Sequence, residues 1–350
     1  MGTSDTPRGS GYRWPAEWEP HEATWLAWPH KEDSWPGKLD RIPPVFVEMV
    51  RALVPAEIVR ILVRSPEEAA GVRGYLGDGG VDLRRVELHE VPTDDAWIRD
   101  HGPIFVTRDG DAPLAVTDWG YNAWGGKYPP WDRDVLVAAT IARHLRVPAF
   151  EPGMILEGGS VDGDGEGTVL TTESCLLHEN RNPDLDRASI ERRLAEYLGA
   201  EKVLWLGDGI VGDDTDGHVD DLARFVAPGV VVTVVEDDPG DANHAALAEN
   251  RRRLESMVDA RGRRLRVREL PMPRPVCEGE DRLPASYANF YVGNGAVLVP
   301  VFDDPADERA LAVLRDCFPD RRIVGLGARD LVWGLGAFHC LTQQQPAVRG

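Results

Sequence analysis

A histidine and a cysteine stand side by side near the C-terminal end of the sequence, at His339 and Cys340. They follow a glycine-rich approach within GLGAFHCLTQQQP (334–346). A cysteine is most often a small buried hydrophobic residue. As a thiolate, it is also a strong nucleophile. Whether Cys340 acts as one depends on the charged and polar side chains that the rest of the chain brings to it.

A second histidine lies in the acidic segment DGHVDD (216–221). If this segment is a strand, His218 and Asp220 point to the same face, because side chains alternate along a strand. The alternative is a solvated acidic loop, since Asp213, Asp214 and Asp216 lie just upstream.

Three further segments offer polar groups that would suit a site. Trp97 and Asp100 in WIRD give an aromatic face and a carboxylate one turn apart, unless Asp100 simply pairs with Arg99. Glu157 precedes two glycines, where backbone can approach closely without side-chain bulk. Asn289 closes SYAN before an apolar strand. Each segment alone has an ordinary structural explanation.

Together these residues predict a site for a flat cation, and a guanidinium fits best. Its donor fork pairs with carboxylates and its face stacks on indole. Carboxylates would fix the group, and the Cys340 thiolate would attack its central carbon. His218 would protonate the departing ammonia and then take a proton from water. Because carboxylates nearby raise the pKa of a thiol, the cationic substrate itself would help to form the thiolate.

Composition agrees with a globular enzyme that acts on a cation. The formal charge of −20 disfavours nucleic acid and anionic membranes and favours a cationic ligand. No apolar run approaches the roughly 20 residues that span a bilayer, and the N-terminal stretch is not a secretory signal. The cysteines at 175, 277, 317 and 340 show no C-x-x-C spacing. We therefore expect reduced thiols in the cytoplasm, with no metal.

A helix-like stretch followed by an apolar run recurs five times along the chain, which indicates repeated modules. Apolar residues recur at three- and four-residue intervals, as at Leu194, Tyr197 and Leu198. After each helix comes a polar segment and then an apolar strand, so we expect five polar segments to converge on one site. The modules are expected at 43–64, at 131–145 continuing into MILEGGSV (154–161), and at 188–207, 243–270 and 307–327.

We expect one domain over residues 12–350, after a disordered lead-in over 1–11. Residues 118–134 are rich in glycine, proline and aromatic residues, and we expect them to form an ordered loop at the mouth of the site. In this loop Tyr121, Trp124 and Asp118 would suit an amine or its alkyl arm.

Several motifs in order carry a family resemblance: RWPAEWEPHEATWLAWPH, WIRDHGPIFV, EGGSVDGDGEGT, GDDTDGHVD and HCLTQQQP. They resemble the agmatine deiminases, in the peptidylarginine deiminase-like family of guanidino-group-modifying enzymes. The resemblance spans about residues 12–346. It implies a pentein fold, which is a five-bladed, pseudo-symmetric α/β propeller of ββαβ modules. It also implies hydrolysis of agmatine to N-carbamoylputrescine and ammonia through a thiouronium on cysteine, a role in putrescine biosynthesis, and no cofactor.

By this resemblance Cys340 is the nucleophile and His218 the general acid and base, with Glu157 as its acidic partner. Asp100 and Asp220 clamp the guanidinium, and Trp97 packs beside it. Further substrate-binding residues are expected at Asn289, Trp124 and Asp214. The chain departs from the family pattern at Leu335, Ala337 and His101, so another guanidino compound stays open as the substrate.

The partner is expected to be a small cationic molecule, and a homodimer is left open. Agmatine is expected over arginine, because loop 118–130 has no arginine to pair with an α-carboxylate; its one cation is Lys127. The alternatives are a deiminase of peptidylarginine, a metal hydrolase that uses DDTDGHVD, and a non-catalytic protein that binds cationic amines. A calcium-loop pattern from Asp162 to Glu173 is interpreted as a glycine-rich hairpin turn, because the flanking MILEGG and TVLTT are expected to be strands.

Overall fold

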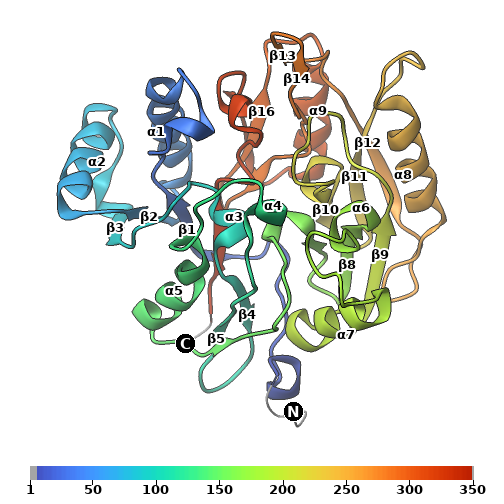
Figure 1. Cartoon of the computed structure of the whole chain (residues 1–350), viewed down its shortest axis with the longest axis horizontal. Coiled ribbons are helices and arrows are strands. Elements are labelled where there is room, and N and C mark those ends of the chain that lie inside the picture. Colours follow the sequence, from blue (N-terminus) through green and yellow to red (C-terminus); the bar gives the residue numbers. More distant parts are fainter. Residues whose placement is uncertain (1–5, 349–350) are drawn as a thin grey trace.

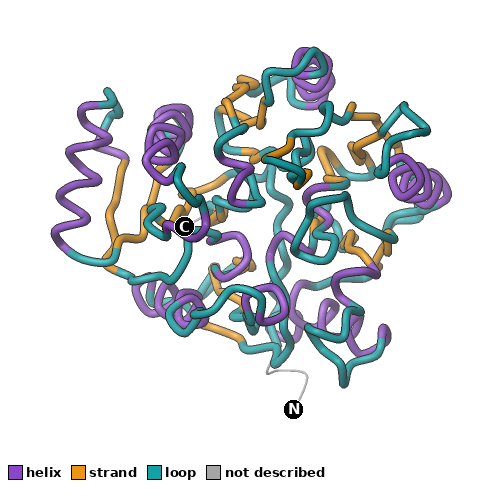
Figure 2. The backbone as a smooth tube through the Cα atoms, turned by 45° about the horizontal axis from the view of Figure 1, so that its top comes forward, coloured by secondary structure: helices purple, strands orange, loops and turns teal. Residues whose placement is uncertain are grey.

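The strands of the protein form several small sheets, and the longer helices lie at the periphery (Figure 1). The structure is a computed structural model that describes residues 6–348 of the 350-residue chain. In a second orientation the helices again lie outside the strands, and loops occupy much of the centre (Figure 2). The fold is therefore a mixed α/β arrangement with loops at its middle.

Five of the sheets share one pairing pattern, in which an antiparallel pair of strands is extended by a parallel strand. A helix joins the two parallel strands, because a parallel pair requires a crossover connection. In spatial order the sheets are β18 (Gln343–Pro346)–β1 (His21–Ala27)–β2 (Ile58–Val63)–β3 (Val86–Glu90); β4 (Ile104–Thr107)–β5 (Leu114–Thr117)–β6 (Ala149–Phe150); β7 (Asp162–Gly163)–β8 (Thr168–Thr172)–β9 (Lys202–Leu206); β10 (Ala223–Ala227)–β11 (Val230–Val235)–β12 (Arg266–Pro271); and β15 (Tyr291–Val292)–β16 (Ala296–Val301)–β17 (Arg322–Gly327). A separate hairpin pairs β13 (Cys277–Glu278) with β14 (Asp281–Arg282).

The crossover helices each bury one face. α7 buries Leu194, Tyr197 and Leu198, as the apolar spacing predicts. Its ends follow from the sequence too: Asp186 accepts a hydrogen bond from the Ser189 N–H, and Gly199 ends the helix at a φ of 73°. The long helices are α1 (Ile42–Leu53), α2 (Pro66–Asp78), α5 (Val137–Leu145), α7 (Arg187–Leu198), α8 (His244–Ser256) and α9 (Asp307–Cys317).

Short helical turns lie between the longer elements, and several of them carry polar residues of the predicted site. They are α3 (Ile98–His101), α4 (Ala123–Gly126), α6 (Glu173–Leu176) and the 3₁₀ turns η1 (Arg8–Ser10), η2 (Glu32–Ser34), η3 (Leu39–Arg41), η4 (Leu83–Arg85), η5 (Asp134–Leu136), η6 (Gly158–Ser160), η7 (Val219–Asp221) and η8 (Leu331–Gly334). Figure 1 shows α3 and α4 near the middle of the molecule.

The five predicted helix–strand repeats are confirmed, with one exception in the second. MILEGG is not a strand: the parallel partner of β5 is the two-residue strand β6, and Glu157 leads directly into η6. Ile155 makes only an isolated parallel bridge with Gly120. The physical reason is that the side chain of Asn182 binds both the N–H and the C=O of Ile155, at 2.9 Å and 2.8 Å, so these groups do not pair with a neighbouring strand.

The apolar core fills the space between the helices and the sheets. The largest buried cluster includes Phe46 of α1, Val231 of β11 and Leu298 of β16. Smaller clusters lie under α7 and under α5, around Leu194 and Ile141. The predicted hairpin turn at DGDGEG is confirmed, since residues 164–167 join the antiparallel strands β7 and β8.

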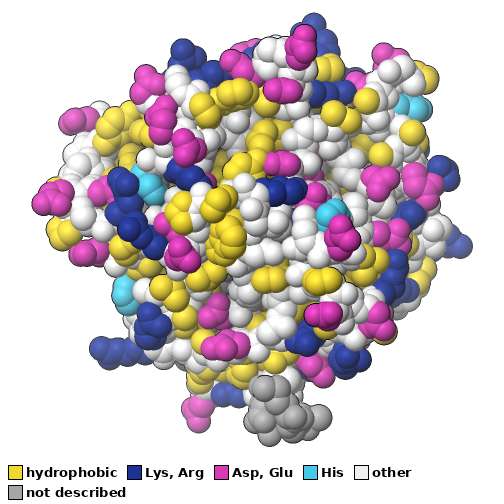
Figure 3. Space-filling view, viewed as in Figure 1, with side chains coloured by type: hydrophobic (Ala, Val, Ile, Leu, Met, Phe, Trp, Pro, Cys, Tyr) yellow, Lys and Arg dark blue, Asp and Glu magenta, His cyan; other side chains and the backbone are white. Residues whose placement is uncertain are grey.

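The N-terminal segment differs in part from the disordered lead-in expected over 1–11. Residues 1–5 lie outside the described residues, but residues 6–11 are ordered around η1, where Tyr12 N–H donates to Pro7 O at 2.9 Å. Among residues 6–348, every helix is too short or too polar to cross a membrane. Acidic and basic side chains are interspersed over the face in Figure 3.

Candidate active site

A cavity of about 820 Å³ opens at the surface, and Cys340 lies in its wall. Four other predicted site residues, Trp97, Asp100, Trp124 and Asp214, line the same cavity. They come from α3, α4 and the loop before η7, so segments far apart in sequence converge here. This convergence confirms that the polar segments of different repeats share a site.

Cys340 lies just after η8 and is only 6% exposed. The glycine-rich approach has a steric reason at Gly336, where a Cβ atom would lie 2.6 Å from the Trp97 ring and 3.1 Å from Cys340 Cβ. Only glycine lets the backbone at residue 336 lie this close to both the Trp97 indole and Cys340.

Asn289 holds the segment that carries the thiol. Its side-chain amide donates to Cys340 Sγ at 3.1 Å and to Asp221 Oδ1 at 3.0 Å. Its side-chain oxygen accepts from the backbone N–H of His339 at 3.1 Å. Asn289, which was predicted to bind the substrate, contacts Cys340 from behind the thiol and is not among the residues that line the cavity.

His218 lies beneath the cavity with no exposed surface, between two carboxylates. Its Nδ1 is 3.8 Å from Asp100 Oδ1, and its Nε2 is 3.9 Å from Glu157 Oε2. Asp220 also lies close to His218. Gly159 packs against both side chains, and a Cβ atom on this glycine would lie 2.6 Å from His218 Nδ1 and 3.0 Å from Asp220 Oδ2. Three predicted catalytic groups, His218, Asp100 and Asp220, therefore meet around Gly159, and Glu157 joins them through His218.

The segment 216–221 is neither a strand nor a solvated loop. His218 is the N-cap of η7, and both His218 and Asp220 are fully buried. The Asp213 carboxylate accepts the backbone N–H groups of Gly217, at 2.9 Å, and His218, at 3.1 Å. Because these donors are used locally, the segment turns instead of pairing with a strand.

The charges around His218 favour an imidazolium. Burial opposes the charge, but Asp100, Cys175 and Glu157 outweigh burial and hold the pKa of His218 well above its usual value. Burial likewise disfavours the Glu157 carboxylate, yet His218 and Arg181 keep the pKa of Glu157 below its usual value. Arg181 Nε donates to Glu157 Oε1 at 2.6 Å.

Asp100 is bound by groups of the site and not by its neighbour Arg99. The Trp124 indole N–H donates to Asp100 Oδ2 at 3.0 Å, and Gly159 N–H donates to Oδ1. Arg99 instead pairs with Glu17 at 3.2 Å. Burial raises the pKa of Asp100, and Asp220 and Glu157 raise it further against the effect of His218.

The surroundings of the free thiol favour its protonated form, as the carboxylates around it predict. Burial raises the pKa of Cys340 well above its usual value, and Asp220, Asp221 and Asp100 add to the effect. Cys340 Sγ is 3.7 Å from Asp220 Oδ2. A cation bound against these carboxylates would favour the thiolate.

The mouth of the cavity carries both signs of charge. Lys127 Nζ lies 2.9 Å from Asp216 Oδ1 and 3.6 Å from Asp214 Oδ1, and Tyr128 OH donates to the Asp214 carboxylate. The prediction for the rest of this loop is wrong: Asp118 and Tyr121 line a separate cavity of about 420 Å³. Tyr121 packs edge-on against Trp124, so it supports the loop from behind.

Several functional groups were missed by sequence reasoning. The sequence marks His339 only as the neighbour of Cys340, although its ring contacts Asp220. Glu17 appears in the sequence only as part of a longer motif, although it contacts His339. Nothing in the sequence around Cys175 distinguishes it from an ordinary buried thiol. The other missed residues, which bind these groups from behind, are Arg181, Asp221 and Arg224. Only the adjacency of His339 to Cys340 gave a usable signal.

Comparison with known proteins agrees with this geometry. The sequence is 41% identical over 370 aligned positions to agmatine deiminase of Pseudomonas aeruginosa (strain LESB58), covering 99% of this chain and 98% of the relative. The fold matches agmatine deiminase of Enterococcus faecalis with a TM-score of 0.91 at 38% identity, over 98% of each chain. It matches substrate-bound C. jejuni agmatine deiminase with a TM-score of 0.85 at 31% identity, over 95% of this chain and 96% of that one. The family model for Porphyromonas-type peptidyl-arginine deiminase matches residues 13–346, and the chain therefore belongs to that family.

Proposed function

We propose that the protein is an agmatine deiminase, which hydrolyses the guanidinium of agmatine to N-carbamoylputrescine and ammonia. The observation that carries the proposal is the position of Cys340 Sγ, 3.7 Å from Asp220 and within the cavity that Asp100 lines. A thiol beside carboxylates is a poor nucleophile by itself, but it becomes a good one when a cationic substrate binds there. The names of the full-length relatives support the same activity.

In the first half-reaction the guanidinium binds between Asp100 and Asp220, with the Trp97 indole beside it. Its positive charge favours the Cys340 thiolate, and the thiol proton leaves to solvent. The thiolate forms a bond to the guanidinium carbon. His218 then donates a proton to the departing nitrogen as the C–N bond breaks, so that ammonia leaves and a thiouronium remains on Cys340.

In the second half-reaction His218, now neutral, accepts a proton from water, and the hydroxide attacks the thiouronium carbon. The C–S bond breaks, the thiolate is regenerated, and the product carries a ureido group after it loses a proton. Glu157 stabilises the imidazolium that forms in each cycle, and Arg181 holds Glu157 in place. No step requires a cofactor.

At the far end of the substrate, the mouth of the cavity suits an ammonium better than a carboxylate. Asp214 lies there with its carboxylate side chain 44% exposed. The nearby cations already have partners: Lys127 lies 2.9 Å from Asp216 and, more distantly, 3.6 Å from Asp214, and Arg282 lies 2.8 Å from Asp241. We infer that Asp214 binds the terminal ammonium, and that Trp124 covers the chain between the two charges.

The proposal is tested by incubating the purified protein with agmatine, arginine and an arginyl peptide while ammonia and ureido product are measured. We expect ammonia and ureido product in equal amounts from agmatine. Turnover of the peptide alone would assign a peptidylarginine deiminase. Binding of agmatine without product would assign a non-catalytic binding protein.

We also propose that the five sheets are the blades of a five-bladed α/β propeller in a single domain over residues 12–350. The repeated strand pairing and the helices at the periphery support this arrangement. The four cysteines are free thiols, which supports a cytoplasmic location. Homodimer formation stays a prediction, and sedimentation of the purified protein would test it.

A further inference from the structure

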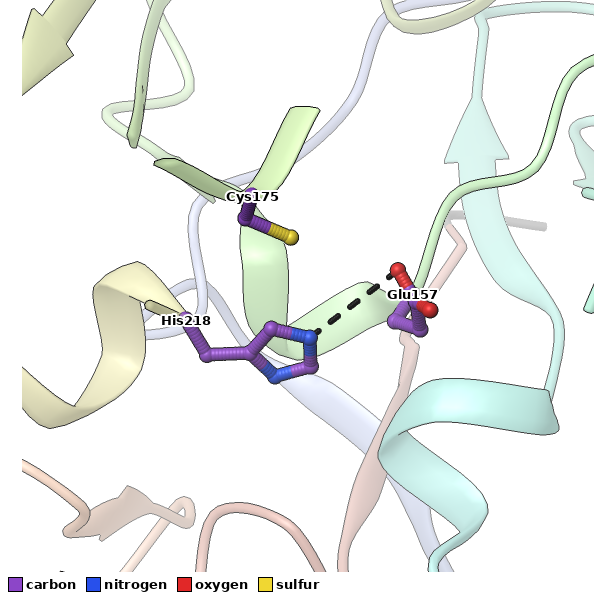
Figure 4. Close-up of side chains that lie close together, drawn as sticks. All are labelled: Glu157, Cys175 and His218. Carbon is purple, nitrogen blue, oxygen red and sulfur yellow. Dashed lines mark ion pairs between the residues drawn. The ribbon is translucent and has the colours of Figure 1, made fainter. Parts of the chain in front are cut away.

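A second thiol lies beside the general acid, and the proposed reaction does not use it. Cys175 belongs to α6 and has no exposed surface. Its sulfur, a nitrogen of His218 and a carboxylate oxygen of Glu157 all lie within 4.8 Å of one another. Figure 4 shows the thiol and the carboxylate pointing into the space beside the imidazole ring.

Within residues 6–348, the nitrogen and oxygen atoms of this cluster lack hydrogen-bond partners. Neither ring nitrogen of His218 has one, and Glu157 Oε2 has none, although all three atoms are fully buried. Buried polar atoms nearly always have a hydrogen bond, so three without one at a single point are unusual, although the ring nitrogens lie 3.8 Å and 3.9 Å from carboxylate oxygens. Arg181 holds Glu157 Oε1 and thereby leaves Oε2 directed to the cluster.

The three side chains offer sulfur, nitrogen and oxygen, a mixture that suits zinc and not magnesium or calcium, which prefer oxygen. Ligands of tetrahedral zinc lie about 3.3–3.8 Å apart, given bonds of about 2.0–2.3 Å. The distance of 3.9 Å between His218 Nε2 and Glu157 Oε2 is close to this value. Small movements of the side chains would therefore complete a three-residue site with water as the fourth ligand.

We propose that Glu157, Cys175 and His218 form a binding site for a zinc-like divalent cation, and that the bound ion inhibits the enzyme. Coordination takes a thiolate and a neutral imidazole, so the protons of these groups are released to solvent. A metal-bound His218 has no proton to give and cannot accept one from water. The metal site rests on this cluster alone, whereas the inhibition rests also on the proposed function.

Access to the site is through the cavity that holds the substrate. Asp100 lines this cavity, and its Oδ1 is 3.8 Å from His218 Nδ1. The acidic lining concentrates cations at this entrance. Cys340 lies in the same wall, so an experiment must separate binding at Cys175 from binding at Cys340.

Binding is tested with Co²⁺, whose bond to a thiolate gives a charge-transfer absorption in the near ultraviolet. The protein would carry Cys277→Ser, Cys317→Ser and Cys340→Ser, which leaves Cys175 as its only thiol. We expect the absorption to saturate at one Co²⁺ per chain, and Mg²⁺ not to compete with it. Absence of the absorption in this folded variant would overturn the proposal.

A matched variant with Cys175→Ser added should lose the absorption and keep the far-ultraviolet circular dichroism of its parent. If that variant does not fold, X-ray absorption of zinc bound to the Cys175-only protein gives the answer instead. One sulfur ligand per zinc is expected, and no sulfur ligand would contradict the site.

Inhibition is tested by titrating Zn²⁺ into the natural protein and into Cys175→Ser, each compared with its own metal-free rate. Loss of a ligand should raise the inhibition constant by about tenfold or more. Equal inhibition of both proteins would place the ion on Cys340 and overturn the proposal. Cobalt binding without any deiminase activity would leave the metal site standing and reject the proposed function.

Discussion

His339 Nδ1 lies 2.6 Å from Asp220 Oδ2, and the opposite nitrogen of the same ring lies 2.9 Å from Glu17 Oε2. All three side chains are buried. Glu17 is in turn fixed by Arg224, at 2.9 Å, and Arg99, at 3.2 Å. The proposed guanidinium clamp Asp220 is thus attached through one imidazole to a buried ionic network, which makes His339 a positioning residue.

Replacing His339 by Asn should therefore affect substrate binding and chemistry together. Asp220 would lose the partner that holds its Oδ2. We therefore expect kcat/KM for agmatine to fall by about 100-fold, through a lower kcat and a higher KM. Steady-state kinetics measure this.

Glu17→Gln keeps the shape of the network and should have a milder effect in the same direction. If His339 had only a structural role, replacing it by Asn would lower the stability of the protein but leave the KM for agmatine and the pH dependence of kcat unchanged.

Cys340→Ser should abolish turnover, because a serine hydroxyl beside Asp220 is a far poorer nucleophile than a thiolate. We expect a loss on the order of a thousandfold or more in kcat, with the fold retained. Cys277→Ser is the control, since this residue is exposed on the β13–β14 hairpin and should keep natural kinetics. Substantial activity in Cys340→Ser would reject the covalent mechanism.

His218→Ala should trap the reaction partway. The imidazole serves both half-reactions, so kcat should fall by about 100- to 10,000-fold. If activation of water suffers most, the thiouronium should accumulate on Cys340 and be seen in intact-mass spectra. Turnover like that of the natural protein would contradict the role given to His218.

The main elements of this fold are predictable from sequence because each repeat carries its own local signal. Leu194, Tyr197 and Leu198 mark the buried face of α7, and Asp186 and Gly199 cap it. In MILEGG (154–159) the local signal is misleading. Its apolar start suggests a strand, but the backbone N–H and C=O of Ile155 are bound by the side chain of Asn182, 27 residues further along the chain.

The candidate site shows the same limit. Cys340, His218 and Asp100 have the types that chemistry requires, so their roles can be inferred singly and their convergence from the repeats. Glu17 and Cys175 act through contacts to residues distant in the chain, and neither type nor spacing distinguishes them. Asp118 has a suitable type, but its loop turns it to another cavity.

Alkylation of the free enzyme should report the raised pKa of Cys340. The thiolate is the species that reacts with iodoacetamide, so labelling should be slow near neutral pH and increase as the pH rises through the pKa of the thiol. Asp220→Asn removes one of the carboxylates that raise this pKa, and it should shift the alkylation curve to lower pH. Cys277→Ser removes the exposed competing thiol from the measurement. An unshifted curve in Asp220→Asn would show that this carboxylate does not act on Cys340.

Agmatine should be preferred over arginine because of what each substrate places at the mouth of the cavity. Arginine would bring an α-carboxylate near Asp214, where the cations Lys127 and Arg282 are already paired with Asp216 and Asp241. A carboxylate that competes for these cations leaves one charge without a partner in a partly buried mouth, which is unfavourable. We expect kcat/KM for agmatine to exceed that for arginine by about a thousandfold or more.

Asp214→Asn tests where this preference arises. The variant should lose affinity for the terminal ammonium, so the KM for agmatine should rise while the KM for a guanidinium compound without a terminal charge, such as butylguanidine, should not. The carboxyl group contacts Lys127 and Tyr128 at the cavity mouth, whereas the thiol is contacted by Asn289 and Asp220, so kcat should change little. The preference would then fall because agmatine loses a partner and arginine loses a repulsion. A ratio between agmatine and arginine within tenfold in the natural protein would show that the mouth does not discriminate by charge.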